Sequence, residues 1–329
     1  MSSQLDSSLS ITNKPRIVFM GTPDFAVGSL DALVSAGHNV VGVITAPDKP
    51  AGRGLKLNES AVKQYAKEKG LHILQPEKLK NPQFLEELKS LKADLQVVVA
   101  FRMLPELVWN MPPLGTINLH ASLLPQYRGA APINWAVING EKETGVTTFK
   151  LQHEIDTGNI LMQEAILIGE NESAGELHDK MKSIGAALIL KTVNGLASGE
   201  LKEVPQSSMG KPSDIKHAPK IFTETAKIDW TKTVDEIYNL IRGLSPYPAA
   251  FAYLDGKLLK IYKAKKEKAH PNLAPGEIET DKKTYLRFAA SDGYISIEEL
   301  QLEGKKRMNV VEFLRGYKFP APDSDAGSD

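Results

Sequence analysis

The first 120 residues alternate between short apolar runs and segments of helical periodicity, and this alternation restricts the possible folds most. Residues Arg16–Met20 form an apolar run that ends at Gly21, which is typical of a buried strand. Apolar side chains then recur at helical spacing from Phe25 to Val34, and Gly37 ends that helix. Further strand-like runs occupy residues 39–45, 71–74, 95–100 and 115–120, with helical segments at residues 59–69 and from 81 onward. Repeated strand–helix–strand units predict an α/β fold with a doubly wound, mostly parallel sheet.

The last third of the chain follows a different pattern. Residues 205–222 combine three prolines with small polar residues, which indicates a linker. A helix is expected within Lys227–Arg242. Short strand-like runs then alternate with the dipeptides Asp255-Gly256 and Asp292-Gly293, and Asp-Gly between apolar runs favours a hairpin. The predicted organisation is an α/β domain at residues 1–204, the linker at 205–222, a small OB-like β-barrel at 223–320 and an acidic tail at 321–329.

The composition is that of a globular protein and excludes every function that needs cysteine. The 42% of hydrophobic residues and 24% of charged residues are typical of a globular chain. Cysteine is absent, which excludes disulfides, thiolate nucleophiles and cysteine-ligated zinc or iron–sulfur sites. Residues Met1–Asn13 are polar and do not match a secretory signal, and no apolar run approaches the roughly 18 residues of a membrane span. We therefore expect a soluble, cytoplasmic protein with no membrane partner.

The turn after the first predicted strand argues against a dinucleotide enzyme. Gly21-Thr-Pro-Asp24 does not match G-x-G-x-x-G, and Pro23 stands where the backbone would have to approach a pyrophosphate closely. A Gly-rich P-loop is also absent from the sequence.

The segment from Gly115 to Pro132 is the strongest candidate for a functional site. Asn118 and His120 are two residues apart in a predicted strand, so their side chains point to the same face. They stand at the carboxyl end of that strand, where open α/β sheets bind their ligands. An isolated histidine is more often structural, but an Asn-x-His pair followed by a loop rich in Pro, Gly and Ala favours a site.

Here the chain resembles a known family. The run Asn118-x-His120-x-Ser-Leu-Leu-Pro-x-x-Arg128-Gly, followed by Asp156-Thr-Gly158, is similar to the signature of enzymes that use 10-formyltetrahydrofolate. The resemblance implies a Rossmann-like catalytic domain in which Asn118, His120 and Asp156 form the catalytic trio. It also implies that the folate donor binds along residues Phe101, Arg102, Met103, Ser122, Leu123, Leu124 and Pro125.

These residue types suit the transfer of a formyl group from an amide-like nitrogen to an amine. An asparagine amide can donate a hydrogen bond to the oxyanion without titrating. An imidazole near neutrality can move the protons, and a nearby carboxylate can orient it. A metal site at His120, His153 and Asp156 is the weaker interpretation because no spacing such as H-E-x-x-H supports it, and we expect no metal.

Two further segments indicate the acceptor. The loop Pro47–Leu57 resembles the tRNA-gripping loop of methionyl-tRNA formyltransferases, with Arg53 at the matching position and Lys49 and Lys56 beside it. Several segments after residue 217 resemble the OB-like C-terminal domain of that family. Lys263, Lys265 and Lys266 then become candidate tRNA contacts; the alternative is that these lysines merely solvate an edge strand.

The resemblance runs from Arg16 to Phe319 and has two departures. Arg102 follows the aromatic residue where the family usually has glycine, and Glu154 and Gln152 replace residues that are commonly Gly and Asp before the catalytic aspartate. The resemblance implies formylation of methionyl initiator tRNA by a monomer. The alternatives are a formyltransferase that acts on a small amine, such as glycinamide ribonucleotide or an amino sugar, and a non-catalytic RNA-binding protein on the same scaffold.

Overall fold

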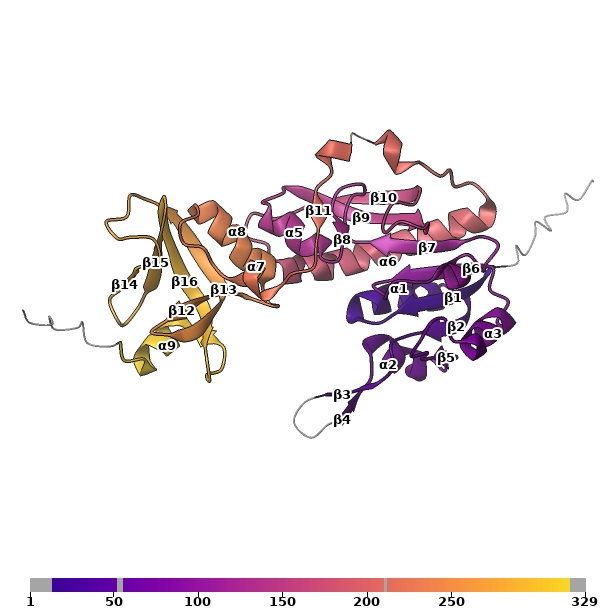
Figure 1. Cartoon of the computed structure of the whole chain (residues 1–329), viewed down its shortest axis with the longest axis horizontal. Helices are drawn as coiled ribbons and strands as arrows, with labels where there is room; N and C mark the ends of the chain where they lie inside the picture. Colours follow the sequence, from indigo (N-terminus) through magenta and orange to yellow (C-terminus); the bar gives the residue numbers. More distant parts are fainter. Residues whose placement is uncertain (1–13, 52–55, 210–211, 320–329) are drawn as a thin grey trace, which may run out of the picture. The chain divides into compact units, whose positions relative to one another are not determined.

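The computed structural model describes residues 14–51, 56–209 and 212–319 of the 329-residue chain, so Arg53 and the predicted acidic tail lie outside it (Figure 1). The chain divides into two compact units. Unit 1 comprises the residues up to His120 together with Val146–Glu164 and Lys182–Met209. Unit 2 comprises Ala121–Gly145, Ala165–Met181 and the residues from Gly210 onward.

Unit 1 is built on a seven-stranded sheet in the order β10-β9-β7-β6-β1-β2-β5. The strands are β1 (Arg16–Gly21), β2 (Asn39–Ile44), β5 (Ile73–Leu74), β6 (Leu95–Val99), β7 (Thr116–His120), β9 (Glu143–Lys150) and β10 (Ile160–Leu167). The neighbours from β5 to β7 pair in parallel, and β9 pairs antiparallel with β7. The prediction of a doubly wound, mostly parallel sheet is therefore confirmed.

Helices accompany the strands of this sheet, and side-chain caps mark the start of two of them. The helices are α1 (Asp24–Ser35), α2 (Ala61–Glu68), α3 (Pro82–Ser90), α4 (Glu106–Trp109) and α6 (Ala174–Ser198). The Ser60 side chain accepts a hydrogen bond from the Lys63 amide at 3.1 Å, and Asn81 does the same for Gln83 at 2.9 Å. Such caps satisfy amides that have no partner inside the helix. None of the described helices is long and apolar enough to cross a membrane.

A small hairpin follows β2 in unit 1. It consists of β3 (Lys49–Ala51) and β4 (Lys56–Asn58), which pair antiparallel with Lys49 opposite Asn58. This hairpin contains the loop that the sequence analysis singled out as a tRNA contact.

Unit 2 ends in an antiparallel half-barrel. Its strands are β12 (Ala250–Leu254), β13 (Lys257–Lys268), β14 (Ile278–Thr280), β15 (Leu286–Ala290), β16 (Gly293–Leu302) and β17 (Met308–Asn309), in the order β12-β13-β16-β15-β14 with β17 beside β16. The Asp255-Gly256 hairpin is confirmed: both residues have positive φ, 48° and 73°, as a tight hairpin turn requires. Helices α8 (Val234–Leu244) and α9 (Val310–Gly316) accompany the sheet, and buried residues of both belong to its apolar core.

The helix expected within Lys227–Arg242 is α8, which begins at Val234. The Thr233 hydroxyl accepts from the Glu236 amide, and Glu236 accepts from the Thr233 amide, so this capping box starts α8 at Val234. The preceding residues are partly extended, since the Ile228 amide donates to the Phe251 carbonyl at 2.8 Å. Residues 227–233 therefore precede the helix.

The segment predicted as a linker, residues 205–222, contains short pieces of regular structure. Gln206–Ser208 forms the 3₁₀ turn η1 and Pro212–Asp214 the turn η2. In unit 2, β11 (His217–Ala218) pairs in parallel with β8 (Arg128–Gly129), just before α5 (Pro132–Ile138). A Cβ on Gly129 would lie 2.4 Å from the Ala218 carbonyl oxygen, so this close pairing requires glycine.

Candidate active site

Strand β7 places Asn118 and His120 on one face of the sheet of unit 1. Asn118 pairs with Val98 of the parallel strand β6 and with Phe149 of β9. His120 lies opposite Thr147 of β9. Ladders on both sides therefore fix the strand that carries the two side chains.

Asp156 comes from the loop between β9 and β10 and meets His120. Its Oδ2 lies 3.9 Å from Nδ1 of His120, and the two side chains are only 11% and 8% exposed. Asp156 adopts a left-handed backbone conformation with φ of 57°, which is uncommon for residues other than glycine. The structure thus brings together two residues that are 36 positions apart in the sequence.

The Asp156-Thr-Gly158 turn packs tightly on strand β9. A Cβ on Gly158 would lie 1.6 Å from the Lys150 carbonyl oxygen, so no other residue fits without movement of the backbone. The Lys150 amide donates to the Asn159 carbonyl at 3.0 Å. Close backbone contact therefore explains why glycine stands two residues after Asp156.

The Asn118 side chain carries a polar atom that the described residues leave unsatisfied. Its Oδ1 is buried, and no described residue hydrogen bonds to it. Buried polar groups nearly always have a partner, so a buried carboxamide oxygen without one is typical of a site that a ligand completes. Because the oxygen and nitrogen of an amide are assigned from their neighbours, either atom can face such a ligand. This observation fits the binding of the polar formyl donor at Asn118.

Residues Phe101, Arg102 and Met103 follow β6 in the same unit. The Arg102 guanidinium donates to the Glu77 carbonyl at 2.8 Å and to the Pro76 carbonyl, and it lies over the Phe101 ring. A hollow of about 540 Å³ is lined by Arg102, Met103 and residues 79–80 and 104–107. The arginine that replaces the family's usual glycine is thus held against the backbone at residues 76–77.

The predicted folate residues Ser122, Leu123, Leu124 and Pro125 belong to unit 2. The Ser122 hydroxyl donates to the Gln126 carbonyl at 2.6 Å, and Leu124 is buried. The Tyr127 amide donates to the Lys216 carbonyl at 2.6 Å, which attaches this loop to the segment before β11.

The predicted tRNA contacts fall into two groups. Lys49 is exposed on β3, the side chain of Lys56 on β4 is not described, and Arg53 lies outside the described residues. On β13, Lys265 and Lys263 face Glu298 at 2.7 and 3.7 Å, and the hydrogen bond to Glu298 raises the pKa of Lys265. Lys266 pairs with Asp235 at 2.6 Å.

The position of these lysines in the sheet bears on the edge-strand alternative. The first part of β13, up to Ile261, lies between β12 and β16. From Lys263 onward its described pairing is with β16. The three lysines therefore occupy the half of the strand that has the less enclosed backbone, and their role stays a prediction.

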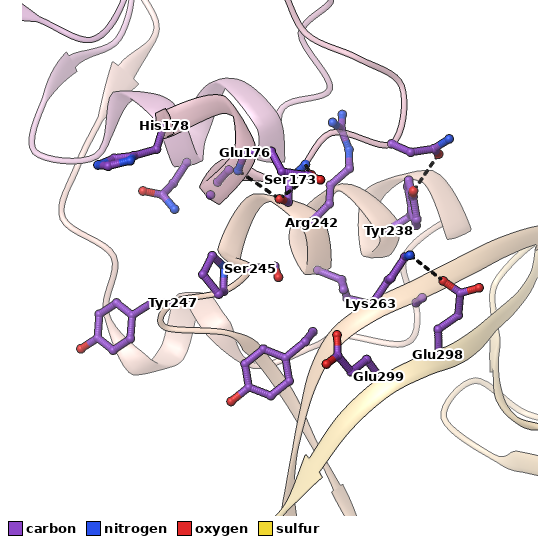
Figure 2. Close-up of a pocket in the computed structure, with 18 of the residues that line it drawn as sticks. Ser173, Glu176, His178, Tyr238, Arg242, Ser245, Tyr247, Lys263, Glu298 and Glu299 are labelled. Atoms are coloured by element: carbon purple, nitrogen blue, oxygen red, sulfur yellow. Dashed lines mark hydrogen bonds and ion pairs between the residues drawn. The ribbon is translucent and has the colours of Figure 1, made fainter. Parts of the chain in front are cut away.

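Unit 2 contains a larger cavity of about 1110 Å³ near the start of α6 (Figure 2). Its lining includes Ser173 and Glu176 from that end, Arg242 from α8, and Lys263 and Glu298 from the half-barrel. Arg242 is buried and donates to the Glu172 carbonyl at 2.9 Å and to Asn239 Oδ1 at 2.8 Å. The lining contains both cationic and acidic side chains, and its described residues do not include the candidate catalytic trio.

Among the described residues, His120, His153 and Asp156 do not form a group that could hold a metal ion. His153 is exposed, lies edge-on to Trp109 and faces Glu106 at 3.5 Å. Within the described part of the chain, no group of three or more His, Asp or Glu residues is arranged to hold a metal ion.

Residues 15–193 match the model of the formyl transferase family, and residues 220–318 match the model of the formyl transferase C-terminal domain. The chain belongs to the formyl transferase family. This formyl transferase is 59% identical over 310 residues to a methionyl-tRNA formyltransferase of Parabacteroides distasonis, a match that covers 92% of this chain and 96% of that protein. It is 60% identical, with the same coverage, to one of Phocaeicola vulgatus.

Solved structures agree with the fold of this formyl transferase. WlaRD, a sugar 3N-formyl transferase crystallised with dTDP and 5-N-formyl-THF, superposes with a TM-score of 0.64 at 21% identity over 89% of this chain and 99% of that chain. HypX from Aquifex aeolicus, in complex with tetrahydrofolic acid, gives a TM-score of 0.63 at 18% identity over 96% of this chain and 50% of that chain.

Gln206 contacts the candidate site but was not predicted from the sequence. Gln206 stands in the segment predicted as a linker. Its side chain is nevertheless buried and donates a hydrogen bond to the Asp156 carbonyl in the loop of the candidate site. The sequence signal for this contact is weak, because a glutamine between proline and serine is also typical of an exposed turn.

Proposed function

We propose that this formyl transferase moves the formyl group of 10-formyltetrahydrofolate to the α-amino group of methionyl initiator tRNA, and so supplies formylmethionyl-tRNA for translation initiation. The observation that carries the proposal is the identity of 59–60% over 92% of the chain with proteins named methionyl-tRNA formyltransferase. The Asn118, His120 and Asp156 arrangement supplies groups that this chemistry needs.

The donor contributes an activated formyl group, whose carbon–nitrogen bond breaks as the new bond to the amine forms. Asn118 would donate a hydrogen bond from its amide to the formyl oxygen as negative charge develops there. Its placement on a strand paired on both sides means that little reorganisation is needed. This role uses the carboxamide that lacks a protein partner for Oδ1 among the described residues.

His120 and Asp156 would manage the protons. The attacking ammonium must lose a proton and the leaving nitrogen must gain one, and an imidazole can do both in turn. Asp156, with its Oδ2 3.9 Å from His120 Nδ1, would orient the ring during transfer.

We further propose that Phe101, Arg102, Met103 and Ser122–Pro125 line the donor site. The tRNA would contact two groups of basic residues: Lys49, Arg53 and Lys56 in one, and Lys263, Lys265 and Lys266 in the other. The exposure of Lys49 supports a tRNA contact at the hairpin. Residues 1–204 and 223–320 would act as the catalytic and tRNA-binding domains of a cytoplasmic monomer.

A formyl-transfer assay tests the proposal. We expect transfer from 10-formyltetrahydrofolate to charged methionyl initiator tRNA and none to the uncharged tRNA. Glycinamide ribonucleotide serves as the small-amine control. Transfer to that amine instead of the tRNA would keep the chemistry and overturn the acceptor, whereas tRNA binding without any transfer would overturn catalysis altogether.

A further inference from the structure

The buried side chain of Gln206 holds the loop that carries Asp156. Gln206 is 4% exposed although it stands in the segment whose composition predicts a linker. Its Nε2 donates to the Asp156 carbonyl at 2.8 Å and to the Gly158 carbonyl, also at 2.8 Å. One side chain therefore ties together the two ends of the Asp156-Thr-Gly158 turn.

The chemistry of this contact requires a primary amide. A glutamine nitrogen carries two N–H donors, and here each of them meets a backbone carbonyl that can only accept. The nitrogen must consequently face the turn, because the amide oxygen would repel both carbonyls. A carboxylate would repel them in the same way, and an apolar side chain would leave both buried carbonyls without this donor.

Gln206 is itself held firmly within unit 1. The neighbouring Val204 exchanges two backbone hydrogen bonds of 2.8 Å with Ile160 at the start of β10. Glu203 pairs with Lys150 at 2.6 Å and accepts from Asn159 at 3.0 Å. The turn η1 then closes through the Ser208 amide and the Pro205 carbonyl at 3.0 Å. The segment is thus anchored on both strands that flank the Asp156 loop.

The loop needs such support because of its own conformation. Asp156 has a left-handed φ of 57°, a region that aspartate enters more readily than most residues but that few non-glycine residues occupy. Residues 152–155 just before it are exposed, so packing of their side chains contributes little to its position. The hydrogen bonds of Gln206 act on the backbone at Asp156 itself and two residues later.

We propose that Gln206 is a positioning residue that sets the Asp156 carboxylate against His120, an inference that rests on the proposed function of the trio. Gln206 acts through the backbone of the Asp156 turn, where it donates to the carbonyls of Asp156 and Gly158. Loss of its two hydrogen bonds lets the turn drift, and a displacement of about 1 Å in a catalytic group can cost on the order of 10²-fold in rate.

Two substitutions test the contact. Gln206→Leu keeps a similar volume and removes the donors, and we expect kcat to fall by up to about 10²-fold while both KM values stay nearly constant. Gln206→Glu places a carboxylate against two carbonyls, and we expect a loss at least as large. Ser208→Ala is the matched control, since it removes the 2.7 Å bond from the Ser208 hydroxyl to the Pro205 carbonyl in the same turn. It should leave kcat unchanged.

A double-mutant cycle separates positioning from general loosening. In the background of Asp156→Asn, where the carboxylate is already gone, Gln206→Leu should lower kcat by no more than roughly twofold further. Losses that multiply would show that Gln206 acts independently of Asp156 and would overturn the proposal. Full activity of Gln206→Leu in the wild-type background would overturn it equally.

Hydrogen exchange gives a readout that does not depend on the reaction. We expect faster exchange of the amides in residues 151–159 in Gln206→Leu, and wild-type exchange in Ser208→Ala. Unchanged exchange in Gln206→Leu would overturn the inference even if formyl transfer is observed. Absence of formyl transfer by the wild-type chain would instead count against the proposed function, while the exchange result would still decide whether Gln206 holds the turn.

Discussion

Strand β7 of unit 1 and strand β13 of unit 2 carry the two kinds of residue that the proposed reaction uses, and their surroundings differ. The β7 side chains are buried or half-buried, and Asn118 Oδ1 has no partner among the described residues. The β13 lysines are exposed and already face acids, with Lys263 and Lys265 both beside Glu298. Exposed ion pairs contribute only about 0–1 kcal/mol each, so a phosphate can replace the acid at little cost. Changes on β7 should therefore alter turnover, and changes on β13 should alter salt-dependent binding.

The largest effect is expected at Asn118. Asn118→Ala removes the proposed donor to the formyl oxygen, so kcat should fall on the order of 10²–10³-fold while tRNA binding stays near the wild-type level. Single-turnover formyl transfer and a separate tRNA-binding titration measure the two quantities. Asn39→Ala, an exposed asparagine at the start of β2, is the control and should change neither. An Asn118→Ala enzyme with full turnover would remove this residue from the mechanism.

A smaller loss is expected when the Asp156 turn is pushed away from β9. Gly158→Ala introduces a Cβ where the Lys150 carbonyl oxygen lies 1.6 Å away, so the turn must move. We expect kcat to fall by on the order of 10²-fold and the free energy of unfolding to fall by about 1–3 kcal/mol. Gly316→Ala is the control, because a Cβ there meets nothing within 4 Å. A Gly158→Ala enzyme with normal kcat would show that the position of this turn does not limit catalysis.

Removing the lysines of β13 should weaken tRNA binding, whereas neutralising Glu298, the acid that they face, should strengthen it. Replacing Lys263 and Lys265 with alanine should weaken tRNA binding and lower the slope of log affinity against log salt by about one per lost phosphate contact. Glu298→Gln leaves both lysines in place without their acid and should strengthen binding a few-fold. Titrations at several salt concentrations measure both. If neither change alters the slope of log affinity against log salt, these lysines only solvate the strand. β13 would then have no role in binding to set against the role of β7 in turnover.

The smallest effect concerns stability at the start of α6. Ser173→Ala removes the hydroxyl that caps the helix at the Glu176 amide, 3.3 Å away, and should lower the free energy of unfolding by about 1 kcal/mol with kcat unchanged. Hydrogen bonds from the Ser173 amide and then its hydroxyl lower the pKa of Glu176. This contribution is therefore complete above the unfolded pKa of about 4.3 and is lost as the pH falls through the lower folded value. Chemical denaturation at pH 7 and pH 3 tests it: the difference between Ser173→Ala and wild type should shrink at the lower pH. A difference of the same size at pH 7 and at pH 3 would contradict the role of the Glu176 carboxylate.

The sequence was most informative where local periodicity decides the structure. Alternating strand and helix signals predicted the parallel sheet, and the spacing of two residues placed Asn118 and His120 on one face of β7. The hairpin at Asp255-Gly256 followed from turn chemistry alone. In each case the deciding interactions lie within a few residues of one another.

Other features depend on partners that are far away in the sequence. The contact of Gln206 joins carbonyls 50 and 48 positions away, which composition does not encode. The pairing of Lys263 and Lys265 with Glu298 depends on register shifts between β13 and β16 around Lys263. The catalytic and tRNA-binding roles of the site residues stay predictions that the experiments above address.

The contact between Gly158 and Lys150 has a consequence for how this loop can vary among relatives. Residues 152–155 are exposed, and Ile155 remains 59% accessible to solvent. By contrast, the backbone from Asp156 to Gly158 is fixed at both ends by Gln206 and lies against β9. Insertions and deletions should consequently accumulate just before the aspartate, whereas the spacing of aspartate and glycine should remain constant from one lineage to the next.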